Sequence, residues 1–380
     1  MTKLYKKLLP YLLISLVVII STLVLWLPFI LKFKEINHIK VEDIGFQHIV
    51  RHWDGPLYII PAKTLYNLKD PVINLSPMGY DPKYFAAHLP LYPLTIRLFA
   101  NFLSYPLAMV FSTLFFSVFL LNFFYFFIKR LKLTEMPLLL TMVLAFFTPR
   151  FFVVRSIGSP EPLFMFLVLS SIYFFTSKKY LLAGLLGGLA TATKTPGLLL
   201  FFAYGLFFIE EWFKTKKIKT NWSGIFLIPA GLLTAFCLYW KQYGDFFAYF
   251  NSGDNIHLVF PPFSVFNFQK NWVGTGWLED IIFVYIFYFL AILTIYEKKE
   301  LRVVFYFMTV FFLSIIFVQH RDIARYSLPL LPFGLISFER FFTGKKFLVI
   351  MLLLLPAVYF YAWNFLLYNT APIADWTPFL

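Results

Sequence analysis

The sequence is short of several features on which soluble enzymes depend. It contains one cysteine, Cys237, among 380 residues, which excludes an intramolecular disulfide and argues against a thiolate metal site. Only 14% of the residues are charged, whereas an ordinary soluble domain has about a quarter. We find no P-loop, no GxGxxG motif and no internal repeat. A soluble enzyme, a disulfide scaffold and nucleotide-dependent chemistry are therefore unsupported.

Long apolar runs dominate the chain. Apolar residues make up 60% of the sequence, and phenylalanine alone occurs 52 times. Since about 20 apolar residues cross a bilayer, this composition predicts an all-α, polytopic integral membrane protein. The first run is too long for a signal peptide and lacks a small-residue cleavage site, so we expect it to remain as a span. Eleven spans are predicted, at about 9–31, 105–128, 135–149, 160–176, 180–193, 196–210, 222–240, 279–296, 303–318, 327–341 and 347–367.

The positive charges predict how these spans are oriented. A net charge of +14 would suggest a nucleic-acid partner for a soluble protein, but in a membrane protein basic residues collect in cytoplasmic loops. With a cytoplasmic N-terminus, 18 of the 33 basic residues fall in six short cytoplasmic segments. They are Lys3, Lys6, Lys7, Lys129, Arg130, Lys132, Lys178, Lys179, Lys214, Lys216, Lys217, Lys219, Lys298, Lys299, Arg302, Arg340, Lys345 and Lys346. We therefore expect no nucleic-acid partner.

Two long loops are predicted on the opposite, extracytoplasmic side, at 32–104 and 241–278. The first is rich in aromatic residues and proline, which predicts short amphipathic helices packed on the membrane surface. Neither loop is large enough to stand alone. Residues 1–380 are therefore expected to form a single transmembrane domain.

Carboxylates at the outer ends of the spans are candidate site residues, because a charge near the bilayer is costly. Asp54 lies in Trp53-Asp54-Gly55-Pro56, where partial burial would raise its pKa and make it a useful general base. A turn or helix-capping aspartate is an equally good interpretation. Glu161 opens a very apolar span, where it either suits the helix dipole or faces an outward cavity.

Basic residues lie at the same ends of the spans. Arg150 and Arg155 precede Glu161, and they are either interface anchors or ligands for an anionic head group. Lys194 either snorkels or contacts a phosphate, and the surrounding Lys-Thr-Pro segment is either a boundary between two spans or a kink in one long element.

Two further arginines lie close to the mouth of a later span. Arg321 and Arg325 flank Asp322, which suits either binding of a lipid phosphate or an internal ion pair. In the predicted topology Asp54, Glu161, Lys194 and Arg325 all map to one membrane face. This convergence predicts a carboxylate base beside cations for a phosphate, facing outward at the lipid surface.

Five segments in this order resemble a known family of membrane enzymes. The first includes Trp53-Asp54-Gly55, then Gly79-Tyr80, then Leu89-Pro90-Leu91-Tyr92-Pro93. The others are Ser159-Pro160-Glu161-Pro162-Leu163-Phe164, Ala192-Thr193-Lys194-Thr195-Pro196-Gly197-Leu198, Tyr243-Gly244-Asp245-Phe246 and Arg325-Tyr326-Ser327-Leu328-Pro329. Together, over about residues 50–335, they resemble the GPI mannosyltransferase II (PIG-V-like) family, which belongs to the GT-C superfamily of glycosyltransferases.

This resemblance implies a GT-C-type helix bundle that transfers a sugar, mannose by analogy, from a polyprenyl-phosphate donor to an acceptor hydroxyl. Asp54 would be the general base of an inverting single displacement, and Glu161 would orient the acceptor or a sugar hydroxyl. The implied ligands of the donor phosphate are Lys194, Arg321, Arg325 and Arg155. The implied sugar or acceptor contacts are Trp53, Tyr58, Tyr80, His88, Asp245 and Tyr326.

Several alternatives stay open at this point. A lipid-linked sugar flippase or transporter without covalent chemistry also needs polar groups at membrane depth, and a membrane scaffold would not depend on Asp54. The acceptor is a glycolipid, a glycan or a protein. No cofactor is required, although Asp54 with Glu161 could hold a divalent ion. The membrane would be the plasma membrane in a prokaryote and the endoplasmic reticulum in a eukaryote.

Overall fold

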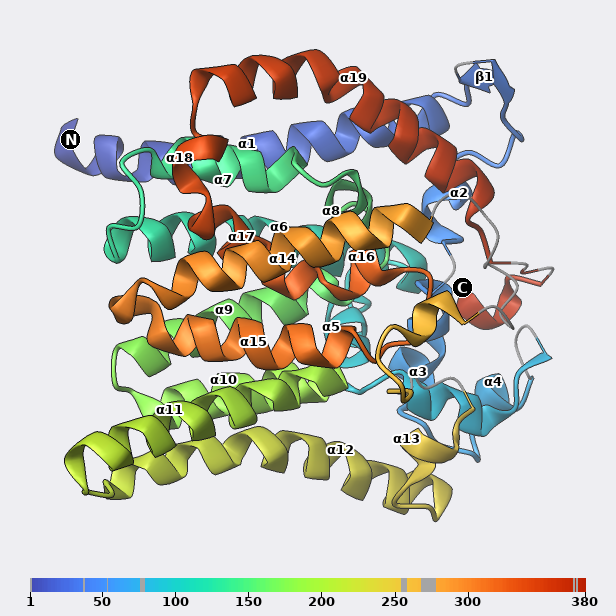
Figure 1. Cartoon of the computed structure of the whole chain (residues 1–380). Coiled ribbons are helices and arrows are strands. Elements are labelled where there is room, and N and C mark those ends of the chain that lie inside the picture. The colour runs from blue at the N-terminus through green and yellow to red at the C-terminus, as the bar shows by residue number, and fades with distance from the viewer. Residues whose placement is uncertain are drawn as a thin grey trace.

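The protein is a bundle of α-helices in a computed structural model, which describes residues 2–36, 38–52, 54–75, 79–253, 258–267, 278–371, 373 and 375–380 (Figure 1). The sheet seen in these ranges is one short hairpin of β1 (Glu35–Ile36) and β2 (Ile39–Lys40), in which Glu35 pairs with Lys40. The predicted all-α membrane protein is thus confirmed at the level of fold class.

Within the described residues, six helices are long and apolar enough to cross a membrane. Two of them include a preceding 3-10 turn: η4 (Thr195–Leu198) leads into α11, and η5 (Thr220–Phe226) leads into α12. The six are α1 (Thr2–Ile30), α6 (Tyr105–Arg130), α11 (Leu199–Thr215), α12 (Leu227–Tyr243), α14 (Glu279–Tyr296) and α19 (Lys345–Tyr368). Each of them overlaps one of the predicted spans, although several extend a few residues beyond its predicted bounds.

The other five predicted spans contain shorter helices. They are α7 (Pro137–Phe146), α9 (Glu161–Thr176), α10 (Tyr180–Thr193), α15 (Arg302–Ile315) and α17 (Leu331–Ser337), the last preceded by η9 (Leu328–Leu330). The number of membrane crossings therefore stays a prediction. In α9 nearly every side chain is buried, including Glu161 at its first position. A helix that is apolar all round belongs in the interior of a bundle.

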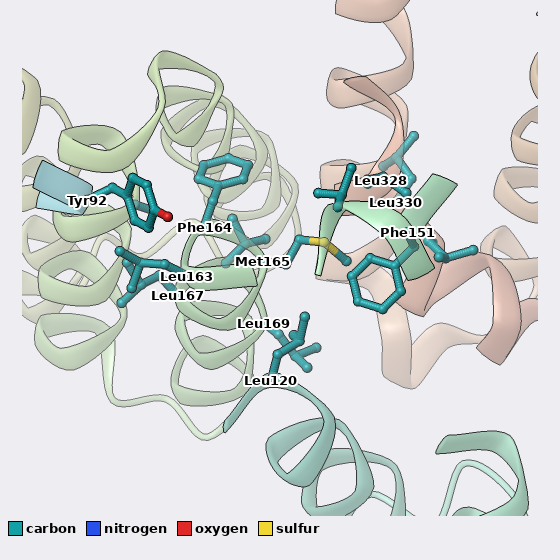
Figure 2. Packing of buried hydrophobic residues seen from close by; sticks show 14 of the residues in the cluster. Tyr92, Leu120, Phe151, Leu163, Phe164, Met165, Leu167, Leu169, Leu328 and Leu330 are labelled. Atoms are coloured by element: carbon teal, nitrogen blue, oxygen red, sulfur yellow. The ribbon is translucent and has the colours of Figure 1, made fainter. Parts of the chain in front are cut away.

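Helix α9 lies at the centre of the packing (Figure 2). It contacts α6 and α10 along its length, and η9 near its start. Figure 2 shows its buried Leu163, Phe164, Met165, Leu167 and Leu169 between Tyr92 of α5 (Leu91–Phe99), Leu120 of α6, Phe151 of α8 (Pro149–Val154), and Leu328 and Leu330 of η9. Helices from both halves of the chain thus surround α9.

The segment around Lys194 is a turn between two antiparallel helices, not a kink in one element. The Ser171 hydroxyl of α9 donates to the Ala183 carbonyl of α10 at 2.7 Å and lies 2.7 Å from the Tyr204 hydroxyl of α11. Ala183 precedes Lys194 by about as many residues as Tyr204 follows it, so the chain reverses between them. Extended backbone at Lys194, with φ −150° and ψ 136°, ends α10.

Short helices gather at one end of the bundle (Figure 1). Most belong to residues 32–104, and α13 (Ala248–Asn251) and α16 (Ile323–Tyr326) join them there. Those of 32–104 are α2 (Gln47–Val50), η1 (Pro56–Tyr58), α3 (Ile59–Thr64), α4 (Pro71–Asn74), η3 (Pro82–Ala87) and α5. The N-terminus and the basic connections α6–α7, α9–α10 and α11–α12 lie at the opposite end (Figure 1).

Glycines allow α10 and α12 to approach closely. A Cβ on Gly188 of α10 would lie 2.5 Å from the Leu227 carbonyl oxygen, and one on Gly231 of α12 would lie 2.1 Å from the Gly188 carbonyl oxygen. Small residues are typical of such contacts between membrane helices, because they let backbones pack directly. These two helices therefore meet backbone to backbone.

The substitution Gly231→Val is expected to lower the free energy of unfolding by about 3 kcal/mol, because the added side chain forces the two helices apart. Thermal unfolding of the purified protein in detergent measures this loss. Gly205→Val is the matched control, since a Cβ on Gly205 of α11 would meet no atom within 4 Å. Equal losses in the two variants would show that the close contact is unimportant.

Candidate functional site

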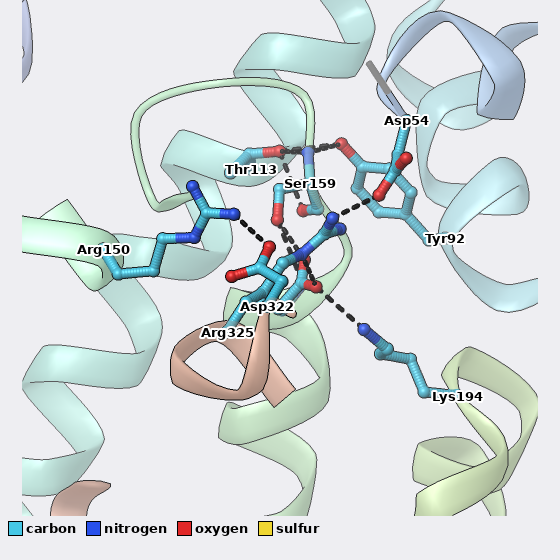
Figure 3. Close-up of polar contacts among 9 residues, drawn as sticks. Asp54, Tyr92, Thr113, Arg150, Ser159, Lys194, Asp322 and Arg325 are labelled. Carbon is cyan, nitrogen blue, oxygen red and sulfur yellow. Dashed lines mark hydrogen bonds and ion pairs between the residues drawn. The ribbon is translucent and has the colours of Figure 1, made fainter. Parts of the chain in front are cut away.

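Four predicted site residues meet at the end of the bundle where the short helices gather (Figure 3). The guanidinium of Arg325 joins two carboxylates: its Nε donates to Glu161 Oε1 at 2.7 Å, and its Nη1 donates to Asp54. Lys194 Nζ donates to the same Glu161 Oε1 at 2.8 Å. We name Asp54, Glu161, Lys194 and Arg325 the charge cluster. Its two anions and two cations balance.

Local structure explains how the chain brings these side chains together. Glu161 is the first residue of α9, and Lys194 lies in the turn between α10 and η4. Arg325 belongs to the single turn α16, and Asp54 lies in a turn in which the Gly55 amide donates to the His52 carbonyl at 3.0 Å. Every member therefore sits at a helix end or in a turn.

Glycines bring the turn of Asp54 close to the start of α9. A Cβ on Gly55 would lie 3.1 Å from the Gly158 carbonyl oxygen, and one on Gly158 would lie 2.5 Å from Met109 Sδ of α6. The absence of both side chains lets the backbone of the two segments approach. Asp54 thereby comes within reach of Arg325.

A second layer of hydrogen bonds holds Glu161 in place. The Ser159 hydroxyl donates to Glu161 Oε2. The Ser159 amide donates to both the Tyr92 and the Thr113 hydroxyl oxygens at 2.9 Å, and these two hydroxyls lie 2.7 Å apart (Figure 3). Since the Glu161 side chain is only 2% exposed, its charge is satisfied almost wholly by protein groups.

A second ion pair lies beside the charge cluster. Arg150 donates to Asp322, and its guanidinium packs over the Phe365 ring at 4.2 Å (Figure 3). The sequence had suggested an internal pair of Asp322 with a neighbouring arginine. That interpretation is wrong in its partner, because Asp322 pairs with Arg150 of α8 while Arg325 pairs with Asp54 and Glu161.

A small cavity adjoins these two ion pairs. It is lined by His52, Asp54, Arg150, Val154, Ile157, Gly158, Ser159 and Arg325, and it measures about 10 Å³. This is about the size that accommodates one water molecule. A sugar phosphate therefore requires the charge cluster to open.

The pKa of Asp54 shifts in the direction opposite to the one predicted from sequence. Burial alone would raise this pKa, but the charge and hydrogen bond of Arg325 hold it below its usual value. Asp54 is thus a carboxylate at neutral pH, but a weak base while it is paired. Burial also lowers the pKa of His52 to about 3 and that of His88 to about 4, so both are neutral at pH 7.

Three other predicted residues lie near the charge cluster. Tyr58 packs edge-on against both His88, at 4.7 Å between ring centroids, and Tyr92, at 5.0 Å. Tyr326 follows Arg325 directly, and Lys194 Nζ lies 6.0 Å from the centre of its ring. These aromatic groups give the charge cluster an apolar side.

The contacts of the remaining predicted residues do not connect them to the charge cluster. Arg155 was proposed as a phosphate ligand, but it is fully buried and donates to Ala145, Thr22 and Ser21 of α7 and α1. Its donors are thus used in joining helices.

The other outlying residues have local roles. Tyr80 stacks on Tyr84 at 3.9 Å, and Asp245 accepts bonds from the Phe247 amide and the Asn251 side chain around α13. Arg321 is exposed and forms no ion pair within the described ranges. Trp53 lies outside the residues that the structure describes.

An arginine separates the two carboxylates that the sequence suggested as candidate ligands of a divalent ion. Arg325 lies between Asp54 and Glu161, and no group of three or more His, Cys, Asp or Glu side chains gathers in the part of the chain that is described. His48 and His52 are four residues apart, but their rings pack against different partners, Phe29 and Phe365.

Several site residues were not selected from the sequence. They are His52, Tyr92, Thr113 and Ser159. Ser159 carried a usable signal, because a serine two residues before a helix-opening glutamate can bond to it. Tyr92 and Thr113 carried none, since a hydroxyl on an apolar helix predicts no particular partner.

Comparisons with known proteins do not place the chain in a family. No protein-family model matches the chain, and a comparison with curated proteins finds no relative.

Proposed function

We propose that the chain is a membrane glycosyltransferase of GT-C type that uses a polyprenyl-phosphate sugar, with mannose as the first candidate. The observation that carries this proposal is the charge cluster, in which Arg325 and Lys194 lie beside two carboxylates at one end of an apolar bundle. Cations at that position suit the phosphate of a lipid donor, and a carboxylate beside them suits proton removal. The similar order of the motifs around Asp54, Glu161, Lys194 and Arg325 adds support.

The proposal includes a topology of eleven crossings with a cytoplasmic N-terminus. The basic connections lie at one end of the bundle and α16, which carries Arg325, lies toward the other (Figure 1). Basic connections are typical of the cytoplasmic side. The charge cluster would then face the extracytoplasmic or luminal side.

The proposed reaction is a single displacement. The acceptor hydroxyl oxygen attacks the anomeric carbon while its proton passes to the Asp54 carboxylate. The bond from the anomeric carbon to the phosphate oxygen breaks, its electron pair goes to that oxygen, and polyprenyl phosphate leaves. Lys194 and Arg325 stabilise the leaving phosphate by charge. The sugar changes anomeric configuration once, so the product is inverted.

Glu161 has a positioning role in this mechanism. It is buried and binds both cations through one oxygen, while Ser159 holds the other oxygen. It therefore fixes where the two positive charges lie. Tyr58 and Tyr326 supply aromatic faces against which a sugar ring can pack.

The test is incubation of membranes containing the protein with radiolabelled polyprenyl-phosphate mannose. Covalent label in an acceptor supports the transferase. Movement of unchanged donor between leaflets would instead identify a flippase. If neither transfer nor movement is detected, the protein is neither a transferase nor a flippase for this donor. Membranes with the Asp54→Asn variant are the control for background transfer.

A further inference from the structure

Arg325 is shared between a fixed carboxylate and a loosely held one. Glu161 is 2% exposed and accepts hydrogen bonds from Lys194, Arg325 and Ser159. The Asp54 side chain is 40% exposed, and Arg325 is its one ion-pair partner in the described ranges. If either contact opens, it is that of Asp54, because water can solvate its carboxylate, while Glu161 would lose a charged partner in a dry site.

The paired state is poorly suited to the proposed chemistry. Arg325 Nη1 is bound to the carboxylate that must accept the acceptor proton. The same nitrogen would have to bind the donor phosphate. Base and phosphate ligand thus neutralise each other in this arrangement, and the adjoining cavity of about 10 Å³ leaves no room for a sugar phosphate.

Charge balance indicates what can separate them. The charge cluster holds two anions and two cations. A lipid phosphodiester with one negative charge that entered without displacing anything would leave one excess negative charge in a partly buried site, which is costly. If it takes the place of Asp54 on Arg325, then two cations again face two anions, now Glu161 and the phosphate. A planar guanidinium also suits a phosphate, because two of its N–H groups can bind two oxygens.

We infer that the phosphate of the lipid donor displaces Asp54 from Arg325, so that the general base becomes free only when the donor is bound. This rests on the proposed transferase function and adds the order of events. The donor binds first, Asp54 turns away from Arg325 toward the acceptor, and deprotonation follows. Since Asp54 is then without its cation, its basicity rises at the moment when it is needed.

The inference predicts an unusual binding result. Asp54→Asn removes the competing charge, so it should tighten binding of farnesyl methyl phosphate, a phosphodiester probe with the lipid chain and one negative charge but no sugar. If Asp54 occupies Arg325 about nine-tenths of the time, the dissociation constant should fall about tenfold. Calorimetric titration of the full chain in detergent measures it. Asp54→Ala should also lower the dissociation constant, whereas Asp54→Glu should bind the probe as the wild type does.

The matched control is Glu42→Gln. Glu42 lies in the same loop as Asp54, but it pairs with Arg51 and not with Arg325. The substitution therefore removes one negative charge, as Asp54→Asn does, without removing a partner of Arg325. Its dissociation constant should stay within about twofold of the wild-type value. Unchanged or weaker binding by Asp54→Asn, equal tightening by Glu42→Gln, or no binding by any form would each overturn the inference. Tighter binding by Asp54→Asn without sugar transfer by the wild type would leave the exchange in place and overturn the transferase instead.

Discussion

Asp54→Asn is expected to lower the rate of sugar transfer about a thousandfold. An amide oxygen can still accept a hydrogen bond from Arg325, but it cannot take the acceptor proton, and a positioned general base contributes about 10²- to 10⁴-fold. The loss should appear in the turnover rate, whereas the affinity for the donor should rise, because Asp54 no longer competes for Arg325. Initial rates with a labelled polyprenyl-phosphate sugar, measured at saturating donor, give the number.

Glu42→Gln is again the comparison, because it alters an exposed ion pair in the same loop and should keep the wild-type rate within about threefold. Thermal unfolding should confirm that Asp54→Asn is folded. A residual rate above about a tenth of the wild-type rate would show that another group accepts the proton.

Glu161→Ala is expected to lower the free energy of unfolding by about 3 kcal/mol, because breaking a buried ion pair leaves charge without compensation. Lys194 would lose its carboxylate, and Arg325 would keep only Asp54. Because Lys194 is 22% exposed, water recovers part of the loss, which places the value at the lower end of the range for buried pairs. Thermal unfolding in detergent at neutral pH measures it.

The comparison for this variant is Glu210→Ala. Glu210 likewise binds two cations, Lys214 and Arg302, but it is 22% exposed and lies away from the charge cluster. Its loss should cost below about 1 kcal/mol, as for most exposed pairs. Similar losses for Glu161→Ala and Glu210→Ala would contradict the view that burial makes Glu161 the anchor of the charge cluster.

The membrane fold and the core of the site could be predicted because each rests on a strong, local physical signal. Apolar runs mark spans by their length, and all six long helices overlap predicted spans. A charge near the bilayer is costly, and the predicted topology alone places Asp54, Glu161, Lys194 and Arg325 on one face. The structure brings these four together.

The pairing of the charges could not be predicted, because the partners are distant in sequence and only the tertiary structure brings them together. Asp322 had two arginines nearby in sequence, but its partner is Arg150 on another helix. The predicted direction of the Asp54 pKa shift was wrong for the same reason. The aromatic neighbours of Asp54 indicated burial, but the sequence did not indicate that Arg325 lies beside it. Arg155 looked like an outward charge, although its donors point into the bundle.

The members of the charge cluster are synthesised at different times. Asp54 and Arg325 are separated by 271 positions, so ribosomes that add about 5 to 20 residues per second need roughly 15 to 55 s between them. Throughout that interval the growing chain carries Asp54 and, later, Glu161 without the arginine that neutralises them. Ribosomal stalling before codon 325 would therefore leave a nascent bundle whose acidic residues lack this cation at the membrane surface.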